Sequence, residues 1–135
     1  MEKLGNRICL DTNVIIDILR GDQETVNKIN ELERSNMLAT TFINLFELYS
    51  GVFLSSKKEE NFNKIENFLP KLILINLSHL STLIGGQIKA NLKTRGQIVE
   101  SRDLLIASIT IAEGFALLTK NKKHFENIPG LKLYD

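Results

Sequence analysis

Cysteine is almost absent from this sequence, with Cys9 as the single example, and histidine occurs only twice. A lone cysteine cannot form a disulfide within one chain, and two histidines far apart in sequence add no plausible zinc site to it. Because Cys9 lies in an apolar run, we expect it to be a small buried side chain rather than a reactive thiol. A disulfide-stapled fold and a cysteine-based metal centre are therefore excluded within the chain.

An excess of charge of either sign is also missing, since 17 basic residues face 16 acidic ones and leave a formal net charge of +1. No overall field draws the chain to nucleic acid, so any such attraction must be local or carried by a bound metal ion. No apolar run is long enough to cross a bilayer, and the first residues lack the apolar segment of a signal peptide. We expect a cytoplasmic protein with no membrane segment.

The residues that are present, 43% hydrophobic and 24% charged, indicate one globular domain over residues 1–135. Apolar runs predict strands, and apolar positions three or four apart predict helices. The predicted strands are 7–10, 37–40, 72–77 and 115–119, with a short edge strand at 131–134. The predicted helices are 12–20, 23–33, 42–51, 56–68, 79–94 and 102–113. This alternation predicts an α/β fold with a mainly parallel sheet of four to five strands and helices on both faces.

Two adjacent glycines, Gly85 and Gly86, lie inside the predicted helix 79–94. Each costs a helix interior about 1 kcal/mol relative to alanine. Close packing of this helix on a neighbouring element would explain both.

Three acidic residues occupy related places in the predicted topology. Asp11 ends the first strand, Glu47 is early in the helix after the second strand, and Asp103 begins the helix that leads into the fourth. Strand C-termini and the N-termini of crossover helices share one edge of a parallel sheet, so these side chains should converge there. Clustered carboxylates beside a core repel each other unless a cation compensates, and oxygen ligands suit Mg²⁺ or Mn²⁺.

A structural role is the alternative for each acid. An aspartate at a strand end or helix start often only caps the helix, which is an even alternative for Asp103 and a weaker one for Asp11. Glu47 taken alone fits a solvated helix position. Spacing and topology by themselves leave both interpretations open.

Five segments, in order along the chain, resemble the PIN-domain family and, within it, the VapC toxins. They are Leu-Asp-Thr-Asn-Val-Ile-Ile-Asp at 10–17, the stretch 42–51 around Glu47, the stretch 96–108 around Asp103, residues 114–125, and Pro-Gly-Leu at 129–131. Each piece is weak alone, but together they span nearly the whole chain. The resemblance implies a three-layer PIN-like fold and metal-dependent endonucleolytic cleavage of RNA by the toxin half of a toxin–antitoxin pair.

The resemblance also implies roles for particular residues. Asp11, Glu47 and Asp103 would hold Mg²⁺ or Mn²⁺, and Glu47 would help to orient the attacking water. Polar supports near the site would be Thr12, Asn13 and Thr119. Implied partners are an RNA substrate, a cognate antitoxin that docks across the site, and a second copy of the chain in a homodimer.

One position departs from the family pattern. Many members carry a fourth acidic residue after the fourth strand, where this chain has Asn121. We include Asn121 in the candidate catalytic group because an amide can accept a hydrogen bond from water or ligate weakly. It brings no negative charge, which leaves the number of bound metal ions open. The basic residues around it are Lys120, Lys122, Lys123 and His124. Contacts with RNA phosphates and a merely solvated basic surface are even alternatives for them.

Two other classes of function compete with the nuclease. A PIN-like module that has lost catalysis and only binds RNA or protein is favoured by Asn121. A phosphotransfer domain would use Asp11 as its nucleophile, but the haloacid-dehalogenase pattern needs an aspartate where this chain has Asn13. The RNA target cannot be read from the sequence, because substrate choice lies in surface shape.

Overall fold

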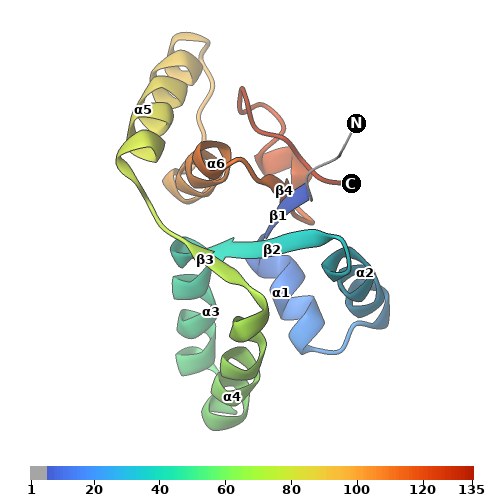
Figure 1. The fold of residues 1–135 in the computed structure, drawn as a ribbon. Coiled ribbons are helices and arrows are strands. Elements are labelled where there is room, and N and C mark those ends of the chain that lie inside the picture. The colour runs from blue at the N-terminus through green and yellow to red at the C-terminus, as the bar shows by residue number, and fades with distance from the viewer. Residues whose placement is uncertain (1–5) are drawn as a thin grey trace.

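The centre of the fold is a parallel sheet covered by helices on both faces (Figure 1). The structure is a computed structural model and describes residues 6–135. Its strands are β1 (Asn6–Leu10), β2 (Asn36–Thr41), β3 (Ile73–Ile75) and β4 (Ala116–Leu118). Their order across the sheet is β3-β2-β1-β4, and every neighbouring pair is parallel. The predicted α/β class, parallel sheet and three layers are confirmed.

Six α-helices connect the strands. They are α1 (Thr12–Leu19), α2 (Gln23–Glu33), α3 (Phe42–Leu54), α4 (Lys58–Phe68), α5 (His79–Thr94) and α6 (Ser101–Glu113). Two short 3₁₀ helices, η1 (Leu69–Lys71) and η2 (Lys122–His124), follow α4 and β4. Figure 1 shows α1 to α4 on one side of the sheet and α5 with α6 on the other. No helix among residues 6–135 is long and apolar enough to cross a membrane.

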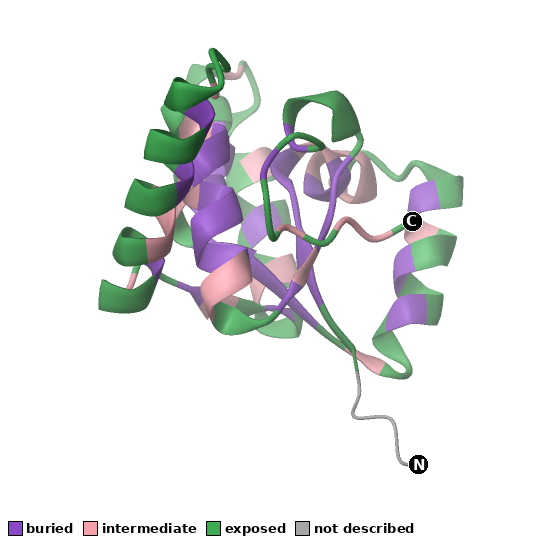
Figure 2. Cartoon of the chain, turned by 90° about the horizontal axis from the view of Figure 1, so that it is seen from above, coloured by how far each residue is buried: buried purple, intermediate pink, exposed green. Residues whose placement is uncertain are grey.

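Side chains that alternate along the strands build two separate cores. In β1, Ile8 and Leu10 pack with α1 to α4, whereas Cys9 between them packs with α5 and α6. In β4, Leu118 and Leu117 divide in the same way. Both faces of the sheet are therefore apolar, as parallel strands require, and the buried segments in Figure 2 lie along the strands and the helix sides that face them. Burial, and then the nearby charge of Asp11, raise the pKa of the Cys9 thiol.

Three predicted boundaries were wrong. The third strand covers only Ile73–Ile75, because it is an edge strand paired with just three residues of β2. The predicted strand 131–134 contributes only an isolated bridge between Leu117 and Leu133, so the sheet has four strands within residues 6–135. Helix α3 does not stop near Gly51 but continues to Leu54 and ends where Ser55 becomes extended. Gly51 keeps a helical φ, unlike Gly114, which ends α6 at φ 76°.

The two helical glycines have different surroundings. A Cβ atom on Gly85 would lie 2.6 Å from the Oγ of Ser108 in α6, whereas one on Gly86 would meet nothing within 4 Å. Close packing of α5 on α6 thus explains Gly85. The same expectation was wrong for Gly86, which faces solvent.

Alanine substitutions should separate these two glycines. We expect Gly86→Ala to raise the free energy of unfolding by about 1 kcal/mol, because it removes a helix-interior glycine in open space. Gly85→Ala should lower it by about 1–3 kcal/mol, because the added methyl group forces Ser108 or the helix backbone to move. Urea unfolding of both variants measures the difference. Equal effects of the two substitutions would contradict the packing of α5 on α6 described above.

Candidate active site

Asp11 stands where β1 ends, at the edge where the sheet changes its direction of winding. The chain passes from β1 outward to β2 and β3, then returns to add β4 on the other side of β1. A crevice beyond the C-terminal ends of the strands is expected at such a point. Asp11 is fully buried and caps α1, with its Oδ1 accepting a hydrogen bond of 2.8 Å from the Thr12 amide. The capping role is therefore real, but it uses only part of this carboxylate.

Neighbouring polar side chains engage the rest of Asp11. Thr119, directly after β4, donates to Asp11 Oδ2 at 2.7 Å. Asn44, in the first turn of α3, donates through Nδ2 to Asp11 Oδ1 at 3.0 Å and to the Thr12 hydroxyl at 2.9 Å. Asn44 is itself fixed by a capping box with Thr41, which is the N-cap of α3. The orientation of Asp11 is thus set by three elements at once.

Glu47 lies one turn beyond Asn44 on α3 and reaches back to the same edge. Its Oε1 accepts a hydrogen bond of 2.5 Å from the Thr12 hydroxyl. Thr12 therefore links Asn44 to Glu47. Asn13 supports a different contact, since its side-chain oxygen accepts from the backbone amide of Lys120 at 3.2 Å.

Asp103 comes to the site from the first turn of α6, together with Arg102. The Arg102 guanidinium lies among the three acids. Its nitrogens reach Asp11 at 2.8 Å (Nη2), Glu47 at 2.7 Å (Nε) and Asp103 at 2.8 Å (Nη1). Asp11, Glu47 and Asp103, which we call the acidic site, are thus brought together around a single cation supplied by the chain itself.

Sequence reasoning missed Arg102 and Asn44. A cation directly before Asp103 in a mostly apolar helix was the available signal for Arg102. For Asn44, the signal was its position three residues after Thr41, a threonine that directly precedes the predicted helix 42–51. Neither signal shows that the side chain faces the acids, because that depends on contacts with residues far away in the chain.

The ion pair between Glu47 and Arg102 favours the charged form of both side chains. Burial alone would raise the pKa of Glu47, but hydrogen bonds from Arg102 and Thr12, and the charge of Arg102, outweigh it and hold the pKa below its ordinary value. Hydrogen bonds to Glu47 raise the pKa of Arg102 despite the opposing effect of burial, and the contacts with Asp103 and Asp11 add to this rise. Three carboxylates and one guanidinium leave two formal negative charges unbalanced.

The donor set of the acidic site suits a hard divalent cation. Its ligands are carboxylate oxygens, and its residual charge is negative, as Mg²⁺ and Mn²⁺ require. Within residues 6–135, however, no three acidic, histidine or cysteine side chains are placed to hold one ion together. Each carboxylate instead lies at hydrogen-bond distance from a nitrogen of Arg102. The carboxylate oxygens are suitable ligands for a divalent ion, but an ion shared by all three acids requires the Arg102 guanidinium to move away from them.

Asn121 reaches the acidic site only indirectly. Its backbone amide donates to the Thr119 hydroxyl at 3.0 Å, and that hydroxyl binds Asp11. The Asn121 side chain is exposed and, within residues 6–135, makes no hydrogen bond with the three acids. Asn121 therefore lies at the rim of the site.

The basic residues near Asn121 differ in how free they are. Lys120 pairs with Asp17, and Lys122 pairs with Asp135 at 2.8 Å. His124 places Nδ1 3.7 Å from the free oxygen of Asp103, and its side chain is more than half exposed. His124 is thus the residue of this group that borders the acids.

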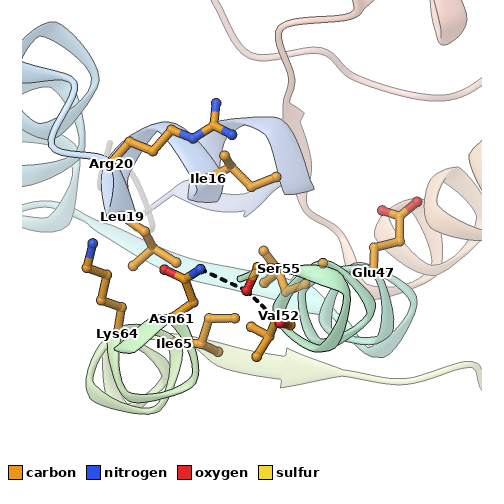
Figure 3. A pocket seen from close by; sticks show the side chains of 11 residues that line it. Ile16, Leu19, Arg20, Glu47, Val52, Ser55, Asn61, Lys64 and Ile65 are labelled. Atoms are coloured by element: carbon orange, nitrogen blue, oxygen red, sulfur yellow. Dashed lines mark hydrogen bonds between the residues drawn. The ribbon is translucent and has the colours of Figure 1, made fainter. Parts of the chain in front are cut away.

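A groove lies beside the acidic site, between α1, α3 and α4. It encloses about 230 Å³. Figure 3 shows apolar side chains such as Ile16, Val52 and Ile65 along it, with Arg20 and Lys64 on the same side and Glu47 at its other end. The groove thus leads from an apolar surface to one of the three carboxylates.

Fold and site together define an α/β protein with a cluster of acidic residues at one edge of a parallel sheet. A family model described as the PIN domain matches residues 8–131, and the chain belongs to this family. "Ribonuclease VapC2" of Rickettsia felis is 38% identical over 92% of this chain and 93% of the relative. The "tRNA(fMet)-specific endonuclease VapC" of Salmonella typhimurium is 30% identical over 96% of this chain and 97% of the relative.

Solved structures agree with this assignment. VapBC2 from Rickettsia felis, bound to a DNA fragment from its promoter, contains a chain that superposes with a TM-score of 0.88 at 36% identity, covering 95% of this chain and 97% of that one. DNA-bound VapBC from Salmonella typhimurium gives a TM-score of 0.86 at 29% identity, covering 96% and 98%. The sequence-based assignment to the PIN-domain family is confirmed.

The lowered pKa of Glu47 predicts how stability changes in acid. A carboxylate with a depressed pKa in the folded state adds stability above its unfolded pKa and loses it as the pH falls through the folded value. The free energy of unfolding should therefore decline below pH 4.5, the ordinary pKa of this group. In urea unfolding between about pH 3 and 7, the free energy of unfolding of Glu47→Gln should decline less steeply than that of the wild type. The exposed control Glu31→Gln should decline as the wild type does. Identical slopes for all three proteins would contradict the ion pair with Arg102.

Proposed function

We propose that this protein is a Mg²⁺- or Mn²⁺-dependent endoribonuclease and the toxin component of a VapBC-type toxin–antitoxin module. The observation that carries the proposal is the convergence of Asp11, Glu47 and Asp103 at the C-terminal edge of the sheet. Full-length similarity to relatives named as VapC ribonucleases supports it. An RNA substrate also favours action in the cytoplasm.

The acidic site offers the parts that phosphodiester hydrolysis needs. Asp11, Glu47 and Asp103 would hold the ion, which when bound polarises a phosphoryl oxygen and lowers the pKa of a water. Thr12, Asn44 and Thr119 keep Asp11 and Glu47 in fixed orientations through the hydrogen bonds described above. Glu47, as the most exposed of the three acids, would accept a hydrogen bond from the attacking water. His124, which lies beside Asp103, would meet the phosphate of an approaching RNA, and Lys123 lines the same pocket as His124.

The groove between α1, α3 and α4 supports the proposed antitoxin partner. Its apolar floor could receive an apolar segment, and its end at Glu47 would bring that segment to the acidic site. Solved relatives named VapBC agree with such an assembly. Further apolar side chains on α3 are exposed, with Phe46 at 72% and Phe53 at 60%, which favours burial against a partner chain, either the antitoxin or a second copy of this one.

A binding module without catalysis is the second candidate. Two observations favour it: Asn121 brings no charge to the rim, and Arg102 already satisfies the three acids. A phosphotransfer role is disfavoured, because Asp11 is fully buried and both of its oxygens accept hydrogen bonds. Such a carboxylate cannot approach a phosphoryl donor as a nucleophile.

RNA cleavage with defined metals tests the proposed function. The wild-type protein should cut RNA in Mg²⁺ or Mn²⁺ and stop in EDTA. Asp11→Asn and Asp103→Asn should each slow cleavage at least about 100-fold, because each removes a charge that holds the ion. Glu31→Gln, an exposed change of the same kind on α2, is the matched control. RNA that is bound but never cut in either metal would establish the binding module instead, and full activity of the Asp11→Asn variant would refute the assigned roles.

Asn121→Asp tests the position of the missing fourth acid. The new carboxylate would add negative charge at the rim, so we expect tighter Mn²⁺ binding and cleavage that saturates at a metal concentration several-fold lower. Asn127→Asp, an exposed change six residues further on, adds the same charge away from the acids. Equal metal dependence of wild type and both variants, measured by cleavage across Mn²⁺ concentrations, would remove Asn121 from the catalytic group.

A further inference from the structure

Arg102 lies among the three carboxylates of the acidic site, and the proposed hydrolysis gives it no role. Each nitrogen of its guanidinium donates a hydrogen bond to one of the three acids. Nε and Nη2 donate to the two oxygens of Glu47, at 2.7 and 2.8 Å. Nη2 also donates to Asp11, and Nη1 donates to Asp103. The Arg102 side chain is 29% exposed, whereas Asp11 is fully buried. The Arg102 side chain thus reaches solvent, as Glu47 does, whereas Asp11 and Asp103 are buried.

The oxygens that Arg102 occupies are those a divalent ion would need. Mg²⁺ binds carboxylate oxygens at about 2.0–2.1 Å in a nearly ideal octahedron, a far tighter arrangement than a guanidinium fork. With the fork in place, no three potential metal ligands of residues 6–135 converge on one point. The arginine and a shared ion therefore compete for the same place.

We propose that Arg102 is an internal counter-cation that neutralises the metal-free site and that the divalent ion must displace. The inference rests on the proposed function for the identity of the competitor, a divalent metal ion. When the ion binds, the guanidinium moves outward towards solvent, and the three carboxylates close on the ion in its place.

Two independent consequences follow from this exchange. Only molecules in which Arg102 has already left the acids can bind the ion, so the measured metal affinity is the intrinsic affinity multiplied by the fraction of such molecules. Removal of the Arg102 guanidinium therefore strengthens binding. The metal-free protein, in contrast, depends on Arg102, because loss of one partner leaves buried carboxylates without compensation. Metal should therefore restore the stability that the substitution removes.

Calorimetry of Mn²⁺ binding, combined with thermal unfolding, tests both consequences. Arg102→Gln should bind Mn²⁺ at least about tenfold more tightly than the wild type, unfold at a lower temperature without metal, and regain the difference in saturating Mn²⁺. Arg95→Gln removes the same charge from an exposed position at the end of α5 and should leave both measurements unchanged. If Arg102→Gln does not fold without metal, Arg102→Lys replaces it, since lysine keeps the charge but lacks the fork, and its affinity should lie between the two. Equal or weaker Mn²⁺ binding by the Arg102 variants overturns the proposal.

A second measurement separates displacement from a simple change of charge. In the NMR spectrum of arginine side chains, the Nε–H signal of Arg102 is assigned by its loss in Arg102→Lys. Saturating Mg²⁺ should move this signal to the region of exposed arginines such as Arg95, while a signal that stays in place as Mg²⁺ binds overturns the proposal.

The proposed function fails separately: Mn²⁺ that binds and displaces Arg102 without any RNA cleavage refutes the nuclease and leaves the exchange intact. Metal-dependent cleavage with unchanged affinity in Arg102→Gln refutes the exchange alone.

Discussion

Charge balance among Asp11, Glu47, Asp103 and Arg102 is the constraint on which the rest of the structure depends. Three carboxylates cannot be packed beside an apolar core without a cation, because the free energy needed to bury unpaired charge is large compared with the net stability of a fold. The structure meets this need with a guanidinium that binds all three. The same residual negative charge that makes the site costly also makes it a place for a divalent ion, so stability and proposed chemistry have one origin.

The parallel sheet delivers the acids to that place. The central strand β1 is buried on both faces, and Asp11 leaves it at the point where β4 joins from the other side. Helices α3 and α6 begin at the same edge, which puts Glu47 and Asp103 within reach. Small polar residues that follow the strands or begin the helices then fix the carboxylates. The convergence of the three acids in this way follows from crossover topology, and it is supported by capping residues that the helices need in any case.

The chain belongs to the PIN domain family, and two residues at or near its acidic site bear on how it would bind a cation. Arg102 supplies a positive charge in the middle of the site, and Asn121 withholds a negative one at the rim. Both lower the attraction for cations compared with a site of four free acids. A metal-dependent reaction at this site would therefore depend on metal supply as well as on substrate.

The sequence by itself determined the α/β class, nearly all of the helices and strands, and the shared edge of the three acids. Apolar periodicity predicts the helices and strands, and their order along the chain predicts the parallel sheet and the edge at which the acids lie. Only the tertiary structure decided where the Arg102 side chain points, since its partners Asp11 and Glu47 are 91 and 55 residues away and a long flexible side chain follows the charges it meets. The short pairing of β3, the lone bridge at Leu133 and the contrast between Gly85 and Gly86 were decided in the same way. Each depends on a neighbour that only folding supplies.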